Sequence, residues 1–115
     1  MKHKNLAVSG WQQLTLLEQL GNIGGEVSRA LHWQKKDDVL FEGAVIRALE
    51  LFDLTLEDER WQGRRWEIAR VREVFCDIVF GKNQYHTSLQ NLLHYFDQFA
   101  YAARLKTYKE ASVNY

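Results

Sequence analysis

Residues 14–35 read LTLLEQLGNIGGEVSRALHWQK and indicate the fold class of this 115-residue chain. Apolar side chains recur there every three or four residues, which is the spacing of one face of an α-helix. The residues that share this face are Leu17, Leu20, Val27 and Leu31. Thr15 followed by Glu18 matches a capping box, in which each side chain accepts the other residue's backbone N–H. We therefore predict an amphipathic helix over about residues 16–35.

Three glycines, Gly21, Gly24 and Gly25, lie inside this predicted helix. Each destabilises a helix by up to about 1 kcal/mol relative to alanine. Either another helix approaches the backbone closely at this point, or the helix bends. The sequence leaves both explanations open.

Three further segments have helical periodicity, at about residues 38–54, 64–80 and 88–105. Their predicted inward-facing residues include Val45, Phe52, Ile68, Phe75 and Phe96. Either Thr87 or Ser88 is expected to cap the last helix. Residues 55–58 resemble a further cap, but residues 57–63 lack a clean apolar period, so we expect a loop or loose first turn there. We expect the C-terminal tail 106–115 to fray.

The chain contains no proline, although average usage of about 5% predicts roughly six. Long uninterrupted helices explain this absence simply. Four amphipathic helices with short connections bury their apolar faces most simply as an up-down-up-down antiparallel bundle. We therefore predict an all-α fold in which residues 1–115 form a single-domain four-helix bundle.

Charge and cysteine content restrict the function classes. Fifteen basic and fifteen acidic residues give a formal net charge of zero, so the diffuse positive field of general nucleic-acid binders is absent. The single cysteine, Cys76, excludes an internal disulfide framework and a cysteine-based zinc site. No apolar run approaches the roughly 18 residues of a membrane span, and no signal-type hydrophobic region follows Met1. These features predict a cytoplasmic protein without membrane contact.

Signatures of enzymes that use helical folds are missing. A di-metal bundle needs Glu-x-x-His pairs, and none occurs. A nucleotide pyrophosphohydrolase needs two carboxylate pairs on neighbouring helices, and only Glu50 with Asp53 fits one of them. Helical ribonucleases of the HEPN type carry an arginine and a histidine at a spacing that this chain lacks. We therefore predict no enzymatic activity, no cofactor and no bound metal.

Charge is distributed unevenly along the chain. Residues 50–59 contain five acidic side chains and no basic one, whereas residues 60–72 contain five arginines and one acid. Tryptophans interleave with these arginines, and together they form what we call the basic aromatic cluster: Arg60, Trp61, Arg64, Arg65, Trp66, Arg70 and Arg72. Arginine and tryptophan are enriched in protein interface hot spots, and they also bind RNA phosphates and unpaired bases. The cluster is our first candidate contact surface, for protein or for RNA.

Two further polar faces follow from helical spacing. A secondary polar face on the predicted helix 88–105 contains His94, Asp97, Tyr101 and Arg104. On the helix 64–80, Trp66, Arg70, Glu73 and Asp77 share one side, so Arg70 is expected to stack on Trp66 and to pair with Glu73. A cation between Glu73 and Asp77 would relieve their repulsion. A metal-dependent hydrolase using Glu73, Asp77 and His94 is therefore the lowest-ranked hypothesis.

The chain resembles known proteins over almost its whole length, and the resemblance is clearest in residues 11–27, 47–55 and 72–77. The sequence resembles a family of small uncharacterised bacterial all-helical proteins, and this resemblance implies a single helical domain without assigning any site. In architecture alone it is similar to the four-helix bundles encoded in ribosomal RNA intervening sequences and to the accessory variability determinant of diversity-generating retroelements. Those proteins assemble as pentamers, and the retroelement protein binds RNA and a reverse transcriptase. The similarity implies a homo-oligomer and keeps RNA among the candidate partners.

Together, these sequence features predict a non-enzymatic helical bundle that acts as an oligomeric scaffold or accessory subunit through protein–protein contacts. The basic aromatic cluster and the secondary polar face are the expected contact surfaces. The alternative is an RNA-binding accessory protein that uses the arginines and tryptophans of residues 60–72.

Overall fold

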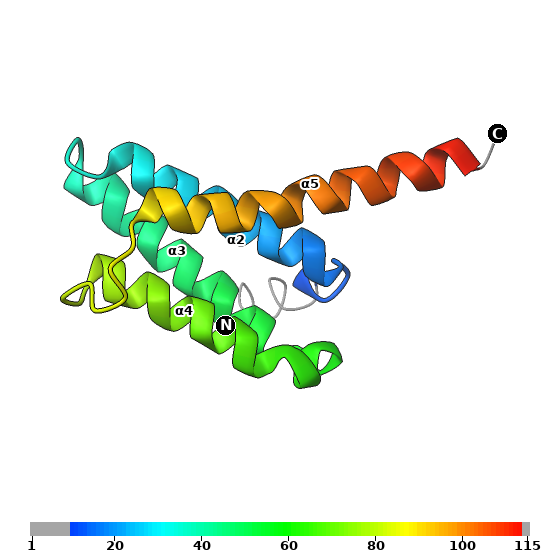
Figure 1. The fold of residues 1–115 in the computed structure, drawn as a ribbon, viewed down its shortest axis with the longest axis horizontal. Helices are drawn as coiled ribbons and strands as arrows, with labels where there is room; N and C mark the ends of the chain where they lie inside the picture. Colours follow the sequence, from blue (N-terminus) through cyan, green and yellow to red (C-terminus); the bar gives the residue numbers. More distant parts are fainter. Residues whose placement is uncertain (1–9, 114–115) are drawn as a thin grey trace.

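The computed structural model describes residues 10–113, and every regular element within them is helical (Figure 1). The four α-helices and the short 3-10 helix η1 follow one another as α2 (Leu16–Trp33), α3 (Asp38–Glu57), η1 (Glu59–Arg64), α4 (Arg65–Val79) and α5 (Leu89–Val113). The predicted all-α class is therefore confirmed for this part of the chain. No helix among the described residues combines the length and the apolar character needed to cross a membrane.

The predicted capping box starts α2. The backbone N–H of Glu18 donates to Thr15 Oγ1 (3.2 Å), and the backbone N–H of Thr15 donates to Glu18 Oε1 (2.9 Å). The helix ends at Trp33, two residues before the predicted boundary, because Lys35 adopts a left-handed backbone (φ 68°). This turn brings Asp37 into position to cap α3 by accepting the N–H of Leu40 (3.0 Å).

Close approach explains the glycines of α2. A Cβ atom added to Gly24 would lie 2.6 Å from the Cβ of Phe96 on α5, and one added to Gly21 would lie 3.4 Å from Ala100. By contrast, a Cβ added to Gly25 would meet no atom within 4 Å. Of the two explanations left open by the sequence, close packing against α5 is the one observed at Gly24.

All four helices contribute to one apolar core. Its centre holds three fully buried phenylalanines, Phe52, Phe75 and Phe96, supplied by α3, α4 and α5. The ring of Phe52 lies 5.9 Å from that of Phe75 and 6.0 Å from that of Phe96, measured between centroids. From α2, Ile23 and Val27 complete this centre. The predicted inward positions are therefore confirmed at Val27 and at the three phenylalanines.

The segment expected to be a loop or loose first turn over residues 57–63 consists mostly of the 3-10 helix η1. Instead of ending near residue 54, α3 continues to Glu57, and η1 follows it. Thr55 is buried inside α3, where its hydroxyl donates to Leu51 O (2.9 Å) and accepts the indole N–H of Trp11 (2.9 Å). Because these hydrogen bonds satisfy the hydroxyl of Thr55 inside the helix, α3 continues past its predicted end at residue 54. The 3-10 helix then leads directly into α4, in the place where a loop or loose first turn was expected.

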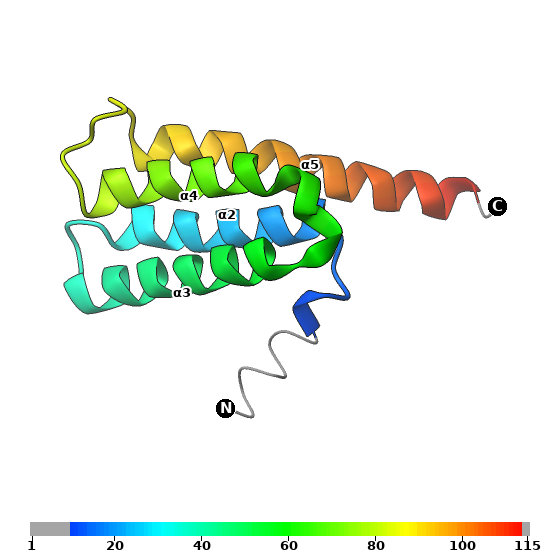
Figure 2. The ribbon, with the colours of Figure 1, turned by 90° about the horizontal axis from the view of Figure 1, so that it is seen from below.

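The last helix is longer than predicted. Ser88 caps it, accepting the N–H of Asn91 (3.1 Å), and α5 then continues through Val113 rather than ending near residue 105. The helix thus includes most of the tail that was expected to fray, and residues 114–115 lie outside the described residues. Residues 104–109 include arginine, leucine and two lysines, with neither glycine nor proline to interrupt the helix. The C-terminal part of α5 projects past the other helices (Figures 1 and 2).

The helices do not pack equally against one another. Whereas α5 packs along α2 and α4 packs along α3, α4 and α5 touch only over a short stretch. The α2–α3 and α4–α5 connections lie at the same end of the molecule (Figure 2). The weak contact between α4 and α5 leaves room for a groove between them.

Candidate functional site

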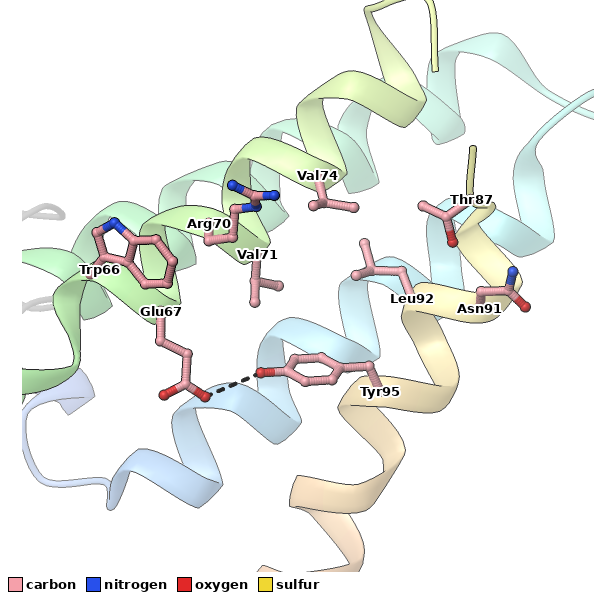
Figure 3. Close-up of a pocket in the computed structure, with 9 residues that line it drawn as sticks. All are labelled: Trp66, Glu67, Arg70, Val71, Val74, Thr87, Asn91, Leu92 and Tyr95. Atoms are coloured by element: carbon pink, nitrogen blue, oxygen red, sulfur yellow. Dashed lines mark hydrogen bonds between the residues drawn. The ribbon is translucent and has the colours of Figure 1, made fainter. Parts of the chain in front are cut away.

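A groove of about 400 Å³ separates α4 from α5. Figure 3 shows side chains from both helices around it: Trp66, Glu67, Arg70, Val71 and Val74 from α4, and Thr87, Asn91, Leu92 and Tyr95 from α5 and the residues before it. Val71, Val74 and Leu92 make much of its wall apolar, and polar groups stand at its rim. Such a combination is typical of a recognition surface.

Trp66 is the most exposed large side chain at this groove. Its ring is 79% exposed, although it follows the first residue of α4 and belongs to the groove wall. An exposed tryptophan beside an apolar wall presents a large rigid surface to a partner. Trp66, a member of the basic aromatic cluster, is therefore accessible for contact.

One hydrogen bond joins the two walls of the groove. The Tyr95 hydroxyl on α5 donates to Glu67 Oε1 on α4 over 3.4 Å (Figure 3), and Glu67 also accepts from Arg64 Nε (3.0 Å). Burial of the Tyr95 ring, and to a lesser extent the Glu67 carboxylate, raises the pKa of the tyrosine. Tyr95 therefore remains a hydrogen-bond donor over the physiological pH range.

The other members of the basic aromatic cluster bond within the protein. Arg60 binds the Asp58 carboxylate (2.7 Å) and donates to Leu14 O (2.9 Å), while the indole N–H of Trp61 donates to Gln19 Oε1 (2.9 Å). These two residues attach η1 to the start of α2. They serve the fold at this end of the molecule, away from the groove.

Three more arginines of the cluster also have internal partners. Arg64 pairs with Glu67 as described above, Arg65 Nε donates to Leu56 O (2.9 Å), and Arg72 Nε pairs with Asp53 Oδ1 (3.0 Å). The acidic stretch before the cluster thus supplies partners to the basic stretch within one chain. Residues adjacent in sequence are consequently spread over η1 and several sides of α4.

Arg70 does not stack on Trp66 as expected. Its guanidinium lies over the ring of Tyr85, 4.8 Å from the centroid, in the connection between α4 and α5. Arg70 therefore lines the groove while its guanidinium contacts the α4–α5 connection at Tyr85. No ion pair between Arg70 and Glu73 is present among the described residues.

A buried polar network between η1 and the start of α2 was not anticipated from the sequence. Gln19 is completely buried, and its amide donates to Trp11 O (2.9 Å) and to Asp58 Oδ2 (3.2 Å). Hydrogen bonds from Arg60, followed by the one from Gln19, lower the pKa of Asp58 to about 2 against the opposing effect of burial. A polar residue in line with Leu16 and Ile23 on the inward face of α2 was the available signal.

The secondary polar face lies on the solvent side of α5. Its four residues, His94, Asp97, Tyr101 and Arg104, are exposed. In the described part of the chain, neither Asp97 nor Arg104 belongs to an ion pair. This face is therefore separate from the groove, which uses the adjacent side of α5.

The residues of the hydrolase hypothesis do not form a common site. Both carboxylate oxygens of Asp77 accept backbone N–H groups of the α4–α5 connection, from Gln84 (3.0 Å) and Tyr85 (3.1 Å). Glu73 is exposed on α4, and His94 is exposed on α5. Among the described residues, no three His, Cys, Asp or Glu side chains gather where they could hold a metal ion. Asp77 instead has a structural role in the loop.

The groove and the outer face of α5 are two of the accessible surfaces in the described part of the chain. Comparison of the chain with protein-family models, with curated proteins and with solved structures finds no match, so these surfaces are interpreted from their own chemistry.

Proposed function

We propose that this protein is a non-enzymatic oligomeric scaffold or accessory subunit that binds a partner protein through the groove between α4 and α5. The exposed Trp66 at the rim of this apolar groove is the observation that carries the proposal. Within this proposal the helices form an up-down-up-down antiparallel bundle, which the two connections at one end of the molecule support (Figure 2). The single cysteine, which leaves no internal disulfide to form, favours a reducing compartment such as the cytoplasm.

The shape and chemistry of the groove favour an amphipathic helix as the bound segment. Two helices form its walls, and apolar side chains between them suit a third helix that buries one face. Trp66 would provide the aromatic anchor that interface hot spots commonly contain. At the rim, Arg70 and Glu67 would orient the segment through polar contacts.

RNA is the weaker candidate partner. Phosphate binding needs accessible guanidinium groups, whereas Arg60, Arg64 and Arg72 already pair with carboxylates. Trp66 could stack on a base, but of the exposed arginines nearest to it in sequence, Arg64 already pairs with Glu67, which leaves Arg70 as the cation at the groove. The observations thus favour a protein partner, and nucleic acid becomes an outcome of the test.

The test places a photo-crosslinking amino acid at position 66 in cells that produce the protein. The matched control carries the same group at position 80, because Phe80 is also an exposed aromatic residue at the other end of α4 and outside the groove. We expect a defined protein to cross-link at 66 and not at 80. The same protein, once purified, should co-elute with the wild type and with Phe80→Ala, whereas Trp66→Ala should abolish co-elution.

Two results would overturn the proposal. One is equal cross-linking at positions 66 and 80, because a specific groove would then be absent. The other is cross-linking to nucleic acid at position 66, together with an excess of absorbance at 260 nm that high salt removes from the purified protein. The second result would make RNA binding the function of Trp66.

A further inference from the structure

The outer face of α5 carries an apolar stripe that the bundle does not use. Tyr101, Leu105 and Tyr108 occur at a spacing of four and three residues, so they share one side of the helix. They are 58%, 38% and 72% exposed. His94, seven residues before Tyr101, extends the stripe toward the start of the helix. The helix thus has one face in the core and an opposite face with unpartnered aromatic surface.

The charged residues beside this stripe would be complementary to those of a second, antiparallel copy. Asp97 and Arg104 are seven residues apart, so they lie on the same flank of α5. When two identical helices pack antiparallel, the two-fold axis places the same flank of both copies together. Tyr101 is the middle residue of α5, and Asp97 precedes it by four residues while Arg104 follows it by three. Antiparallel pairing centred on Tyr101 therefore brings each Asp97 beside the Arg104 of the partner.

The length of α5 fits the same arrangement. Its C-terminal part projects past the other helices (Figure 1), whereas its N-terminal half lies along α2 with the outer side open. In an antiparallel pair centred on Tyr101, the projecting half of each copy covers the exposed outer side of the other copy's N-terminal half. Each His94 then lies near Tyr108 of the other copy, and Tyr101 packs against its own equivalent at the axis.

We infer that two copies of this chain form a two-fold dimer by antiparallel packing of α5 on α5, centred on Tyr101. The occupant of the exposed stripe is thus a second copy, because the register of apolar and charged residues along α5 complements itself. This interface differs from the groove, since groove residues Asn91 and Tyr95 lie on another flank of α5. The dimer therefore stands independently of the groove function proposed above.

A charge exchange tests the interface. The single variants Asp97→Arg and Arg104→Asp each place like charges opposite one another, and each should weaken dimerisation by about tenfold or more in sedimentation equilibrium. The double variant D97R/R104D restores opposite charges and should dimerise as the wild type does. A mixture of the two single variants should form a mixed dimer. Unchanged circular dichroism would show that these exposed substitutions leave the fold intact.

Site-directed cross-linking tests the register. In a Cys76→Ser background, a short bismaleimide should link two copies of Tyr101→Cys, whose cysteines flank the axis. Copies of His94→Cys should not link to one another, because antiparallel pairing separates those positions by about 20 Å along the helix axis. A mixture of His94→Cys with Tyr108→Cys should link. Trp66→Ala should leave dimerisation unchanged, which separates this interface from the groove.

Several results would overturn the inference. They are a monomer at all accessible concentrations, an oligomer that the single charge variants leave unchanged, and efficient linkage of His94→Cys to itself. The last result would indicate parallel pairing. The Asp97–Arg104 register would also be wrong if the double charge variant kept its fold but did not recover dimerisation.

Discussion

Gly24 is the residue at which α2 and α5 approach most closely through a missing side chain. Replacing it with alanine places a Cβ atom 2.6 Å from the Cβ of Phe96, which is fully buried and has no space to retreat. We expect Gly24→Ala to lower the free energy of unfolding by about 1–3 kcal/mol, because overpacking outweighs the better helix propensity of alanine. Urea denaturation followed by circular dichroism measures this change.

Gly25 provides the matched control in the same helix. A Cβ atom added there would meet nothing within 4 Å, so Gly25→Ala should raise the free energy of unfolding by up to about 1 kcal/mol through helix propensity alone. The two substitutions are chemically identical and adjacent in sequence. Effects of the same sign would contradict close packing at Gly24.

Asp58 makes the free energy of unfolding depend on pH in the acidic range. Its pKa is about 2 in the folded protein, against an ordinary value of 3.8, mainly because Arg60 donates hydrogen bonds to the carboxylate. The folded state therefore favours the ionised form, which contributes about 2 kcal/mol above pH 4 and loses that contribution as pH falls from about 4 to 2. Asp58→Asn should be less stable than the wild type by about this amount at neutral pH.

Denaturation at a series of pH values checks this prediction. The difference between wild type and Asp58→Asn should shrink as pH falls below 4, because the wild-type carboxylate then becomes neutral as well. Other acidic groups titrate in both proteins, so the difference between them isolates Asp58. A difference that stays constant between pH 5 and pH 2 would contradict the role of the ionised carboxylate.

Residue patterns anticipated some of these roles. The glycines of α2 indicated close approach or a bend, yet the sequence did not say that Gly24 rather than Gly25 contacts α5, since both lie within one turn. Gln19 occupied an inward position, but its partner Trp11 lies before α2, eight residues away, and its partner Asp58 is 39 residues away. Identifying the network requires the positions of three segments in space.

At the scale of elements, Asp77 fixes the connection between α4 and α5. Its carboxylate accepts two backbone N–H groups, from Gln84 and Tyr85, and Tyr85 in turn lies under Arg70 at the groove rim. We expect Asp77→Ala to lower the free energy of unfolding by about 1–3 kcal/mol, since hydrogen bonds to a charged acceptor are lost. Hydrogen exchange should accelerate at the amides of Gln84 and Tyr85.

Glu73→Ala is the control for this loop. Glu73 is an exposed carboxylate one turn earlier on α4, so its removal should change stability by less than about 0.5 kcal/mol and leave the loop amides protected. If both variants accelerated exchange equally, the effect would come from the charge of α4 and not from the loop contacts.

Element boundaries were predictable where a local signal sets them. Thr15 with Glu18 caps α2 as the sequence indicated, and Ser88, one of the two expected candidates, caps α5, because capping depends on residues within one turn. The end of α3 was misplaced because Thr55 bonds to Trp11, which is 44 residues away. No local pattern contains such a partner.

At the scale of the whole molecule, the residues of the basic aromatic cluster are close in sequence but do not form one surface. Its arginines and tryptophans follow one another within residues 60–72, but helical rotation and the change from η1 to α4 point them in different directions. Acidic residues of the preceding stretch then pair with two of the arginines, Asp53 with Arg72 and Asp58 with Arg60. The secondary polar face, which depends only on the period of one helix, remained together as predicted.

The projecting part of α5 leads to a prediction for the whole protein. Core contacts of this helix come from Leu89, Leu92 and Phe96, and Ala100 packs near Gly21, all before the projecting part. A chain truncated after Leu105 should therefore keep its fold and, in dilute solution, its thermal midpoint. It should lose the dimer, because Tyr108 no longer covers the partner's His94.

Thermal denaturation over a range of protein concentrations distinguishes these two roles of α5. Association stabilises the folded state by mass action, so the wild-type midpoint should rise with concentration while that of the truncated chain stays constant. Tyr101→Glu, which places a charge at the proposed axis, should behave like the truncated chain. In dilute solution both proteins are monomeric, so loss of the dimer cannot lower the thermal midpoint there. If the truncated chain nevertheless had a lower midpoint in dilute solution, the projecting segment would stabilise the single copy and not only the dimer.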